Sequence, residues 1–370
     1  MTWPTKKLGE IISFEKGRKM AIASAGEPYI GIDGLRTNQY AVYTQEKKGV
    51  RCKPDDVLLV WDGAHAGTVG TGLSGFVGST IVKVLHANSL ENRFLFYLLK
   101  FFQEKIRAAA QGAAIPHLNK TFINVLKIPL PPLKIQQQIV ERIDKIAEAQ
   151  KLNDKQIELA EELFQSLLHH ELDPKGKNWE VKKLGDICEI NPRTNLDLKR
   201  DKIKYAEMAA VDENLKEIRY FLDRPINKVS SGAPKFKDND VIFARITPCT
   251  ENGKLAFVEN CPGVCAGSTE LHVLRARPNN LLPRFLFYYL IRPKIKNMAV
   301  ESMIGSTGRQ RVPAEFFHYL KIPVPPIETQ RKIVEKLSAV QDYKKKLLEQ
   351  KSKLEELFES VLNKAFKGQL

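Results

Sequence analysis

The sequence is poor in the residues that build covalent frameworks, and it has no long apolar run. Its 370 residues include only five cysteines: Cys52, Cys188, Cys249, Cys261 and Cys265. This small, uneven set is not that of a disulfide-stabilised domain, so we expect a reducing, cytoplasmic environment. The absence of eighteen consecutive apolar residues predicts no transmembrane helix. The first residues also lack the apolar core of a signal peptide.

Motifs for catalysis are missing too. There is no Gly-x4-Gly-Lys-Ser/Thr phosphate loop. The Gly-rich run at 67–72 is followed by no helical period, so we predict a tight hairpin there rather than a nucleotide loop. Asn191-Pro192 begins like an amino-methyltransferase motif but is not completed. Cys261-x3-Cys265 lacks a second ligand pair at zinc spacing. We therefore predict no catalytic residue, no metal and no cofactor in this chain.

What the sequence does contain is a duplication. The matched segments are Trp3-x-x-Lys-Lys-Leu-Gly9 with Trp179-x-x-Lys-Lys-Leu-Gly185, Leu126-Lys-Ile-Pro-Leu-Pro-Pro132 with Leu320-Lys-Ile-Pro-Val-Pro-Pro326, and Glu161-Glu-Leu-Phe164 with Glu355-Glu-Leu-Phe358. Long repeats of this kind indicate two similar modules rather than one large fold. We divide the chain into a module at 1–132, a long helix at 133–172, a module at 177–326 and a long helix at 327–370.

Each module is predicted to be α+β and rich in strands. Short β-branched runs such as Val57–Trp61 and Val241–Ala244 follow aspartate turns and predict strands. A Gly-Ser-Thr element, 78–80 in one copy and 267–269 in the other, leads into a further strand. Aromatic amphipathic helices follow, and we expect their rings to lie in the core. The Pro-rich segment at the end of each module stops strand and helix alike.

After each Pro-Pro pair, apolar residues recur at helical spacing for more than 35 residues without Pro or Gly. Each such helix would span roughly 55 Å. A single apolar stripe on a long charged helix needs a partner stripe. We predict that the two helices pair with each other as an antiparallel coiled coil with pseudo-two-fold symmetry. A homodimeric coiled coil is the alternative.

The charge distribution points to a polyanionic partner. The formal net charge is +15. Segments 141–172 and 335–366, in the helices, carry −4 and +1, so the remaining residues carry +18. A basic excess in the β-rich modules is the electrostatic signature of nucleic-acid binding.

The loops of both modules carry the side chains that contact DNA. Arg reads guanine, Asn or Gln reads adenine, acids accept from the cytosine amine, and Lys, Ser and Thr bind phosphate. Any one of them has a solvated loop side chain as its simpler interpretation, but as groups they predict DNA contact. The candidates are Arg18, Lys19, His65, Thr68, Ser79, Thr80, His117, Asn119 and Lys120 in the first module, and Arg245, Thr247, Asn252, Lys254, Ser268, Thr269, Thr307, Arg309, Gln310 and Arg311 in the second.

Taken together, these motifs resemble the specificity (S) subunits of type I restriction–modification enzymes. The resemblance covers essentially the whole chain. It rests on the Trp-x-x-Lys-Lys-Leu-Gly openings, the Gly-Ser-Thr and Arg-Phe-Leu-Phe-Tyr segments, and the Leu-Lys-Ile-Pro-x-Pro-Pro boundaries that continue through Gln136 or Gln330 and Ile-Val-Glu into the helices.

The resemblance implies two target recognition domains, each reading one half of a bipartite site in double-stranded DNA. The helices would set the unread spacer and dock two methyltransferase (M) subunits. Restriction/translocase (R) subunits would complete the assembly, and no membrane would be involved. The methyl donor and ATP would belong to those partners, and this chain would be non-catalytic.

Two other functions are compatible with the residues alone. One is a stand-alone DNA nuclease or methylase with a diverged active site. The other is a coiled-coil assembly protein whose positive modules bind acidic proteins or RNA.

Overall fold

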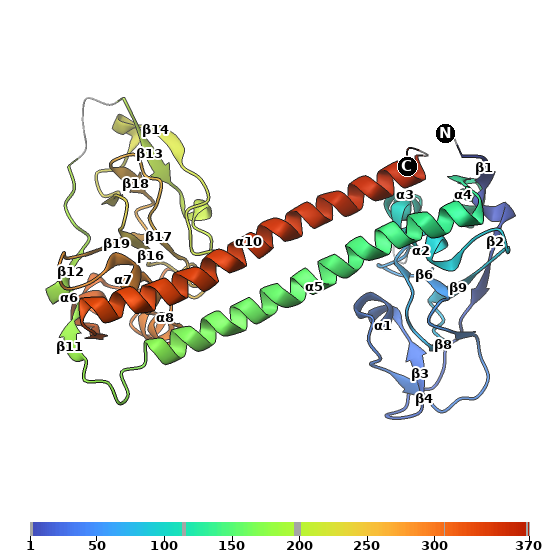
Figure 1. The fold of residues 1–370 in the computed structure, drawn as a ribbon, viewed down its shortest axis with the longest axis horizontal. Helices are drawn as coiled ribbons and strands as arrows, with labels where there is room; N and C mark the ends of the chain where they lie inside the picture. Colours follow the sequence, from blue (N-terminus) through green and yellow to red (C-terminus); the bar gives the residue numbers. More distant parts are fainter. Residues whose placement is uncertain (1–2, 113–115, 196–200, 307, 368, 370) are drawn as a thin grey trace. The chain divides into compact units, whose positions relative to one another are not determined.

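The computed structural model describes residues 3–112, 116–195, 201–306, 308–367 and 369 (Figure 1). The chain divides into two compact units, one of Met1–Lys155 with Leu348–Leu370 and one of Gln156–Leu347. Each unit holds one β-rich module together with the beginning of one long helix and the end of the other. The units are described one at a time.

The first module is built on two four-stranded sheets within the described residues. The first sheet has the order β2 (Ile12–Lys16), β9 (Ile81–His86), β6 (Val57–Val60) and β7 (Val69–Gly70). The second has the order β4 (Tyr43–Thr44), β3 (Glu27–Ile30), β8 (Gly75–Val77) and β5 (Arg51–Cys52). Strands β3 and β8 are parallel, whereas the other pairs are antiparallel.

The beginning and end of this module are joined. Strand β1 (Thr5–Lys7) pairs with β10 (Lys127–Pro129), the strand before the Pro-Pro pair. The remaining elements are η1 (Leu8–Glu10), α1 (Ile32–Thr37), α2 (Asn92–Phe101), α3 (Gln103–Ala108) and α4 (Lys120–Val125). A hairpin is present at the Gly-rich run 67–72, as predicted, but the run supplies its second strand, β7, which pairs antiparallel with β6, rather than a tight turn.

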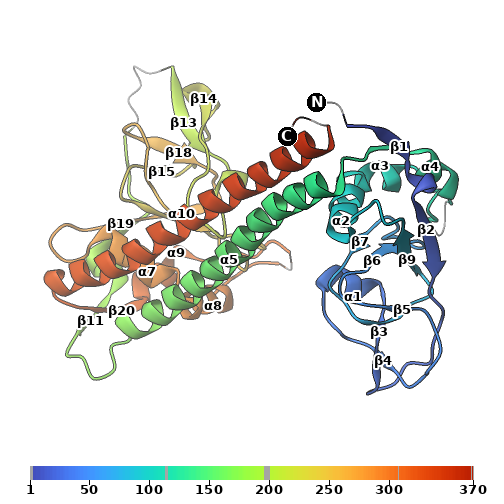
Figure 2. The same cartoon turned by 45° about the vertical axis from the view of Figure 1, so that its right-hand side comes forward.

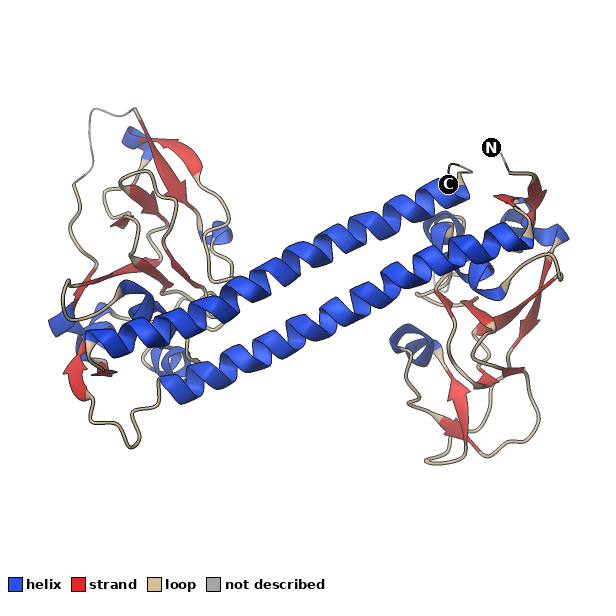
Figure 3. Ribbon diagram, in the orientation of Figure 1, coloured by secondary structure: helices blue, strands red, loops and turns tan. Residues whose placement is uncertain are grey.

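The second module repeats this strand order. Figure 2 shows the two modules from another side, and Figure 3 colours the strands of both modules red. One sheet has the order β12 (Cys188–Ile190), β19 (Leu271–Ala276), β16 (Val241–Ala244) and β17 (Leu255–Phe257). The other has the order β14 (Leu222–Pro225), β13 (Lys202–Ala206), β18 (Cys265–Gly267) and β15 (Lys235–Phe236). Strand β11 (Glu180–Lys183) pairs with β20 (Lys321–Val324), as β1 does with β10. The predicted duplication is therefore present in the fold.

The helices of this module are α6 (Leu184–Ile187), α7 (Pro283–Leu290), α8 (Pro293–Glu301) and α9 (Ala314–Tyr319), with the 3-10 turns η2 (Met208–Ala210) and η3 (Ile226–Lys228). The rings of α2 and α7 are buried in the core, as predicted: Phe94, Tyr97, Phe285 and Tyr288.

A disulfide joins Cys261 and Cys265, whose Cα atoms lie 6.0 Å apart, within the range that the bond can bridge. From the sequence we interpreted Cys261-x3-Cys265 only as an incomplete metal site, so this disulfide was not predicted.

The long helices are α5 (Leu133–Glu171) and α10 (Ile327–Phe366). They pack against each other within each unit. The paired residues are Gln150 with Leu354 and Asp154 with Lys351 in the first unit, and Glu161 with Lys344 and Glu171 with Lys336 in the second. In both units the residue numbers on α10 decrease as those of their partners on α5 increase, so the predicted antiparallel pairing is confirmed.

Each module holds the end of the helix that began in the other. Phe358, Leu362 and Phe366 of α10 pack on the core of the first module. Phe164, Leu168 and Leu172 of α5 do the same in the second. No helix in the described part of the chain has the length and apolar composition needed to cross a bilayer.

Candidate nucleic-acid interface

The candidate residues of the first module gather where β6 ends. There, the backbone N–H of Trp61 donates to the carbonyl of Thr80 at 2.7 Å, and the Trp61 carbonyl accepts from the N–H of Leu118 at 3.0 Å. Three segments therefore meet at this point: the end of β6, the loop before β9, and the loop before α4.

The second module has the same meeting point after β16. The N–H of Arg245 donates to the carbonyl of Glu270 at 3.0 Å, and the Arg245 carbonyl accepts from the N–H of Val312 at 2.8 Å. These bonds make Arg245 the counterpart of Trp61, and Glu270 the counterpart of Thr80. Arg311 is likewise the counterpart of His117, since each precedes the residue that donates to the end of the strand.

This equivalence corrects the sequence match of the two Gly-Ser-Thr elements. The N–H of Ile81 donates to the carbonyl of Gly78, whereas that of Leu271 donates to Ser268 rather than to Gly267. Gly78 therefore corresponds to Ser268. The two loops have the same length, and the sequence match of the Gly-Ser-Thr elements is displaced by one residue from the structural match.

In the second module, a carboxylate holds two guanidinium groups. Nε and Nη2 of Arg311 donate to the two oxygens of Glu270 at 2.8 and 2.7 Å. Nε of Arg245 donates to Oε2 of the same carboxylate at 3.4 Å. The hydrogen bond from Arg311 is the main reason why the pKa of Glu270 lies below its ordinary value, against the opposing effect of burial. Both arginine side chains stay partly exposed, so they remain available to a ligand.

Beneath this cluster lies a neutral histidine. His272 is buried, and its Nε2 lies 2.8 Å from the carbonyl of Val312. Burial lowers its pKa, although the hydrogen bond to Val312 opposes the shift. Its Nδ1 lies 2.9 Å from Nδ2 of Asn191. The histidine thereby fixes the segment that carries Arg311.

In the first module, a carboxylate again holds two basic side chains. Nζ of Lys16 donates to Oδ2 of Asp62 at 2.8 Å, and Nδ1 of His117 lies 2.6 Å from Oδ1. Burial opposes ionisation of Asp62, but the hydrogen bonds from Lys16 and His117 outweigh it and lower its pKa. The carboxylate is 15% exposed, whereas the side chain of His117 is 56% exposed.

Five other candidates of the first module are Arg18, Lys19, Ser79, Thr80 and Lys120. The N–H of Arg18 donates to the carbonyl of Val77, beside the 78–80 loop, and its side chain pairs with Glu46 at 2.9 Å. Lys19 and Lys120 are exposed, and Ser79 and Thr80 are half-buried.

Three further candidates of this module have structural hydrogen bonds. Thr68 donates through Oγ1 to the carbonyl of His65 at 2.8 Å. Nε2 of His65 lies 3.3 Å from Nη1 of Arg36. The side-chain oxygen of Asn119 caps α4 by accepting from the N–H of Phe122 at 3.0 Å. The cap accounts for that oxygen without DNA.

In the second module, the candidates divide between surface and interior. Lys254 is directed inward, because its Nζ donates to the carbonyl of Met208 at 3.2 Å and pairs with Glu213 at 3.4 Å. Oγ1 of Thr247 donates to the carbonyl of Gln310 at 3.4 Å. Oγ of Ser268 accepts from the N–H of Glu270 at 3.3 Å. The exposed candidates are Asn252, Thr269 and Arg309, and Thr307 lies outside the described residues.

A hollow of about 630 Å³ adjoins Arg245 and Thr269. It is also lined by residues that sequence reasoning did not assign to the site: Asn191, Arg193, Thr194, Asn195 and Lys235. Among these residues only Asn191, with Pro192, belongs to a recognisable sequence pattern, and that pattern indicated an incomplete methyltransferase motif rather than a DNA contact. Their amide, hydroxyl and cationic groups extend the polar surface around Arg245.

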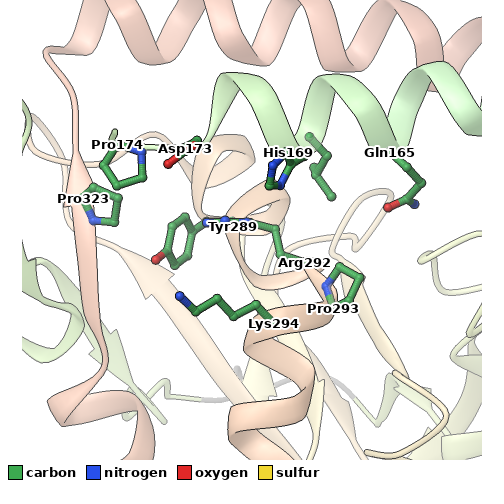
Figure 4. A pocket seen from close by; sticks show the side chains of 10 residues that line it. Gln165, His169, Asp173, Pro174, Tyr289, Arg292, Pro293, Lys294 and Pro323 are labelled. Carbon is green, nitrogen blue, oxygen red and sulfur yellow. The ribbon is translucent and has the colours of Figure 1, made fainter. Parts of the chain in front are cut away.

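A second pocket of about 530 Å³ lies at the end of α5 (Figure 4). Tyr289, Arg292 and Lys294 from the α7–α8 corner face His169 and Asp173 across it. None of the candidate residues lines it. Across the described ranges there is no group of three or more His, Cys, Asp or Glu side chains that could hold a metal ion.

Comparisons with known proteins agree on one family. The family model described as the type I restriction modification DNA specificity domain matches residues 1–162 and 176–357. The chain is 24% identical over 405 residues to the type I restriction enzyme MjaVIII specificity subunit of Methanocaldococcus jannaschii, covering 100% of this chain and 93% of that protein.

Two solved structures share the fold. The type I restriction–modification S subunit from M. genitalium gives a TM-score of 0.68 at 17% identity, covering 99% of this chain and 96% of that one. A chain from a study of type I R-M complex assembly and conformational transition gives a TM-score of 0.60 at 20% identity, covering 100% and 98%. Both likenesses confirm the predicted fold.

Proposed function

The chain belongs to the type I restriction–modification DNA specificity family, and on this premise we propose that its two modules read the two halves of a bipartite DNA site. It is the DNA specificity subunit of such a system and carries two target recognition domains. By family it is not catalytic. The alternatives of a stand-alone nuclease or methylase and of a general assembly protein are therefore set aside.

The observation that carries the proposal is the basic side chain found at one equivalent position in both modules. It is His117 in the first and Arg311 in the second, each partly exposed beside the end of a central strand. Arginine in this setting suits bidentate contact with guanine, whereas histidine cannot form that contact in the same way. The two modules share the same backbone arrangement at this position but carry different side chains, which supports the recognition of two different half-sequences.

The basic excess supports binding to the DNA backbone. Outside residues 141–172 and 335–366 the chain carries +18, and the exposed candidates Lys19, Lys120 and Arg309 belong to that excess. Contacts of this kind release counterions and fix the register of the protein on the duplex, while base contacts select the sequence.

The long helices offer apolar surface that this chain leaves uncovered. Leu152, Leu159 and Leu163 of α5 are 58, 52 and 51% exposed, and their spacing places them along one side of the helix. On α10, Tyr343 and Leu357 are also exposed. We propose that these faces dock two methyltransferase subunits, and that restriction/translocase subunits complete the complex. Methyl donor and ATP then bind to those partners.

The helices also set the unread spacer in this proposal. A reader with two modules must match the DNA helical repeat of about 34 Å per turn, so the separation between its modules selects the spacing of the half-sites. The proposed boundaries are 1–132 and 177–326 for the recognition domains, and 133–172 and 327–370 for the spacer helices.

A module exchange tests the proposal. Residues 1–125 are replaced by the corresponding module of another specificity subunit, the complex with methyltransferase subunits is assembled, and the methylated sites are mapped. We expect one half of the modified site to change and the other to stay. A change in both halves, or in neither, would refute the assignment of one half-site to each module.

A further inference from the structure

A carboxylate holds the equivalent basic side chain in both modules, yet the carboxylate comes from a different position in each. Asp62, which holds His117, corresponds to Ile246 of the second module, since the bridges Asp62–His117 and Ile246–Arg311 are equivalent. Glu270, which holds Arg311, corresponds to Thr80. The arrangement is thus not a copied sequence motif, because two different residues achieve the same contact.

Stability does not account for both carboxylates. A single ion pair between partly exposed side chains, such as Lys16 with Asp62, contributes little to folding, although the bidentate pair of Arg311 with Glu270 contributes more. A negative charge is also unfavourable in a surface that receives phosphates, since it repels the backbone that the surrounding lysines and arginines attract. Acids placed against basic candidate residues in both modules therefore need another role.

The geometry of Arg311 indicates that role. Its Nε and Nη2 face Glu270, so the guanidinium plane is fixed while Nη1 stays on the side away from the carboxylate. An arginine that reads a base edge must present its planar fork in one direction, and a free arginine side chain has many rotamers. A partner that fixes the plane before binding reduces the ordering cost on DNA.

The same reasoning applies to His117. The carboxylate of Asp62 accepts a hydrogen bond from Nδ1 of His117 at 2.6 Å, and this contact fixes the orientation of the imidazole ring. Lys16 shares the carboxylate and keeps it ionised through a hydrogen bond of 2.8 Å. Asp62 therefore sets the ring orientation of the residue that occupies the position of Arg311 in this module.

We propose that Glu270 and Asp62 are positioning residues for DNA recognition, which orient Arg311 and His117 and so govern sequence discrimination rather than overall affinity. This inference rests on the proposed function. A positioning role and a purely electrostatic role predict opposite changes in DNA affinity when either carboxylate is neutralised. Removal of a negative charge from a basic surface should strengthen binding to any DNA, whereas loss of orientation should weaken binding to the cognate site.

The test uses the complex with methyltransferase subunits and two duplexes, one with the mapped site and one scrambled. For Glu270→Gln we expect affinity for the site to fall about tenfold, the loss of one good base contact, with affinity for the scrambled duplex unchanged or higher. Glu217→Gln is the matched control, because Glu217 is a partly exposed acid of the same unit that pairs with Lys345 on α10. It removes the same charge and should leave the ratio of the two affinities unchanged.

A double-mutant cycle establishes whether Glu270 acts through Arg311. If it does, adding Glu270→Gln to Arg311→Ala causes no further loss of discrimination. Additive losses would overturn the proposal, as would an unchanged affinity ratio for Glu270→Gln. Glu270→Asp, which retains the charge, should recover part of the ratio. This recovery keeps the test decisive should Glu270→Gln fold poorly.

The first module provides an independent arm. Asp62→Asn should relax the sequence preference in one half of the methylated site, and Glu270→Gln in the other half. If both variants relax the same half, or if neither relaxes any, the positioning role is wrong. If instead the parent complex shows no site preference at all, the proposed function itself fails, so the two failures are distinguishable.

Discussion

The buried side chain of Gln136, in the first turn of α5, accepts a hydrogen bond from the backbone N–H of Glu91 at 2.9 Å. Its Nε2 donates to the carbonyls of Ser89 and Pro131 at 2.9 and 2.8 Å. Gln330 makes the corresponding three bonds at the start of α10. One amide thus ties the start of each long helix to the loop before the aromatic helix of its module.

Gln136→Ala should lower the free energy of unfolding by roughly 2 kcal/mol, because it leaves buried backbone groups without partners. Urea unfolding measures this change. Gln137→Ala is the matched control, since the neighbouring Gln137 is exposed, and it should have little effect. Equal losses for the two variants would contradict the role that we assign to Gln136.

His272 should make the stability of the second unit sensitive to mild acid. Burial lowers its pKa below the ordinary value of 6.5, so below that pH the unfolded chain binds a proton that the folded chain does not. Stability that is present above pH 6.5 is therefore lost as the pH falls through 6.5 towards the folded pKa.

Urea midpoints at about pH 7.5 and about pH 5.5 bracket this loss. We expect the drop between them to be smaller in His272→Gln than in the parent. His318→Gln is the control, because His318 is exposed in the same unit. An undiminished drop in His272→Gln would assign the acid sensitivity to other groups.

Leu159→Glu should separate DNA binding from complex assembly. Leu159 is about half exposed on α5, so a charge there costs little in the free chain but disrupts an apolar contact with a methyltransferase subunit. Co-purification of the subunits should be lost while the far-UV circular dichroism stays unchanged. Gln156→Glu adds the same charge at an exposed polar position and should retain the complex. Retention of the complex by Leu159→Glu would move the docking face elsewhere.

Lys120→Ala should weaken DNA binding about equally for all sequences and reduce the slope of log affinity against log salt by about one. Titration of the complex with DNA at several salt concentrations measures that slope. Lys145→Ala, on α5 where Lys145 pairs with Glu141, should leave the slope unchanged. A selective loss for the cognate site would make Lys120 a reader of bases.

The sequence predicted the frame of this protein better than its site. The duplication, the antiparallel helices and the aromatic core were recognisable because each imposes a repeated pattern on many residues. The basic residues Arg245, Arg311 and His117 were found because basic loop residues are typical of DNA contact.

Other parts of the site were not predictable from local pattern. Glu270 was missed because an acid among basic residues has the same local signature as a solvated charge. Its pairing with Arg311, 41 residues away, depends on backbone hydrogen bonds between loops. The inward direction of Lys254 likewise depends on Met208 and Glu213, which no local pattern connects to it.

Each module packs against the start of its own long helix and against the C-terminal end of the long helix that begins in the other module. Phe366 contacts Phe94 and Phe101 in the first module, and Phe164 contacts Tyr288 in the second. A recognition module borrowed from another gene must therefore accommodate a foreign aromatic tip as well as supply new reading loops. An exchanged module can therefore vary in its loops, but it must keep residues that pack against Phe366 or Phe164.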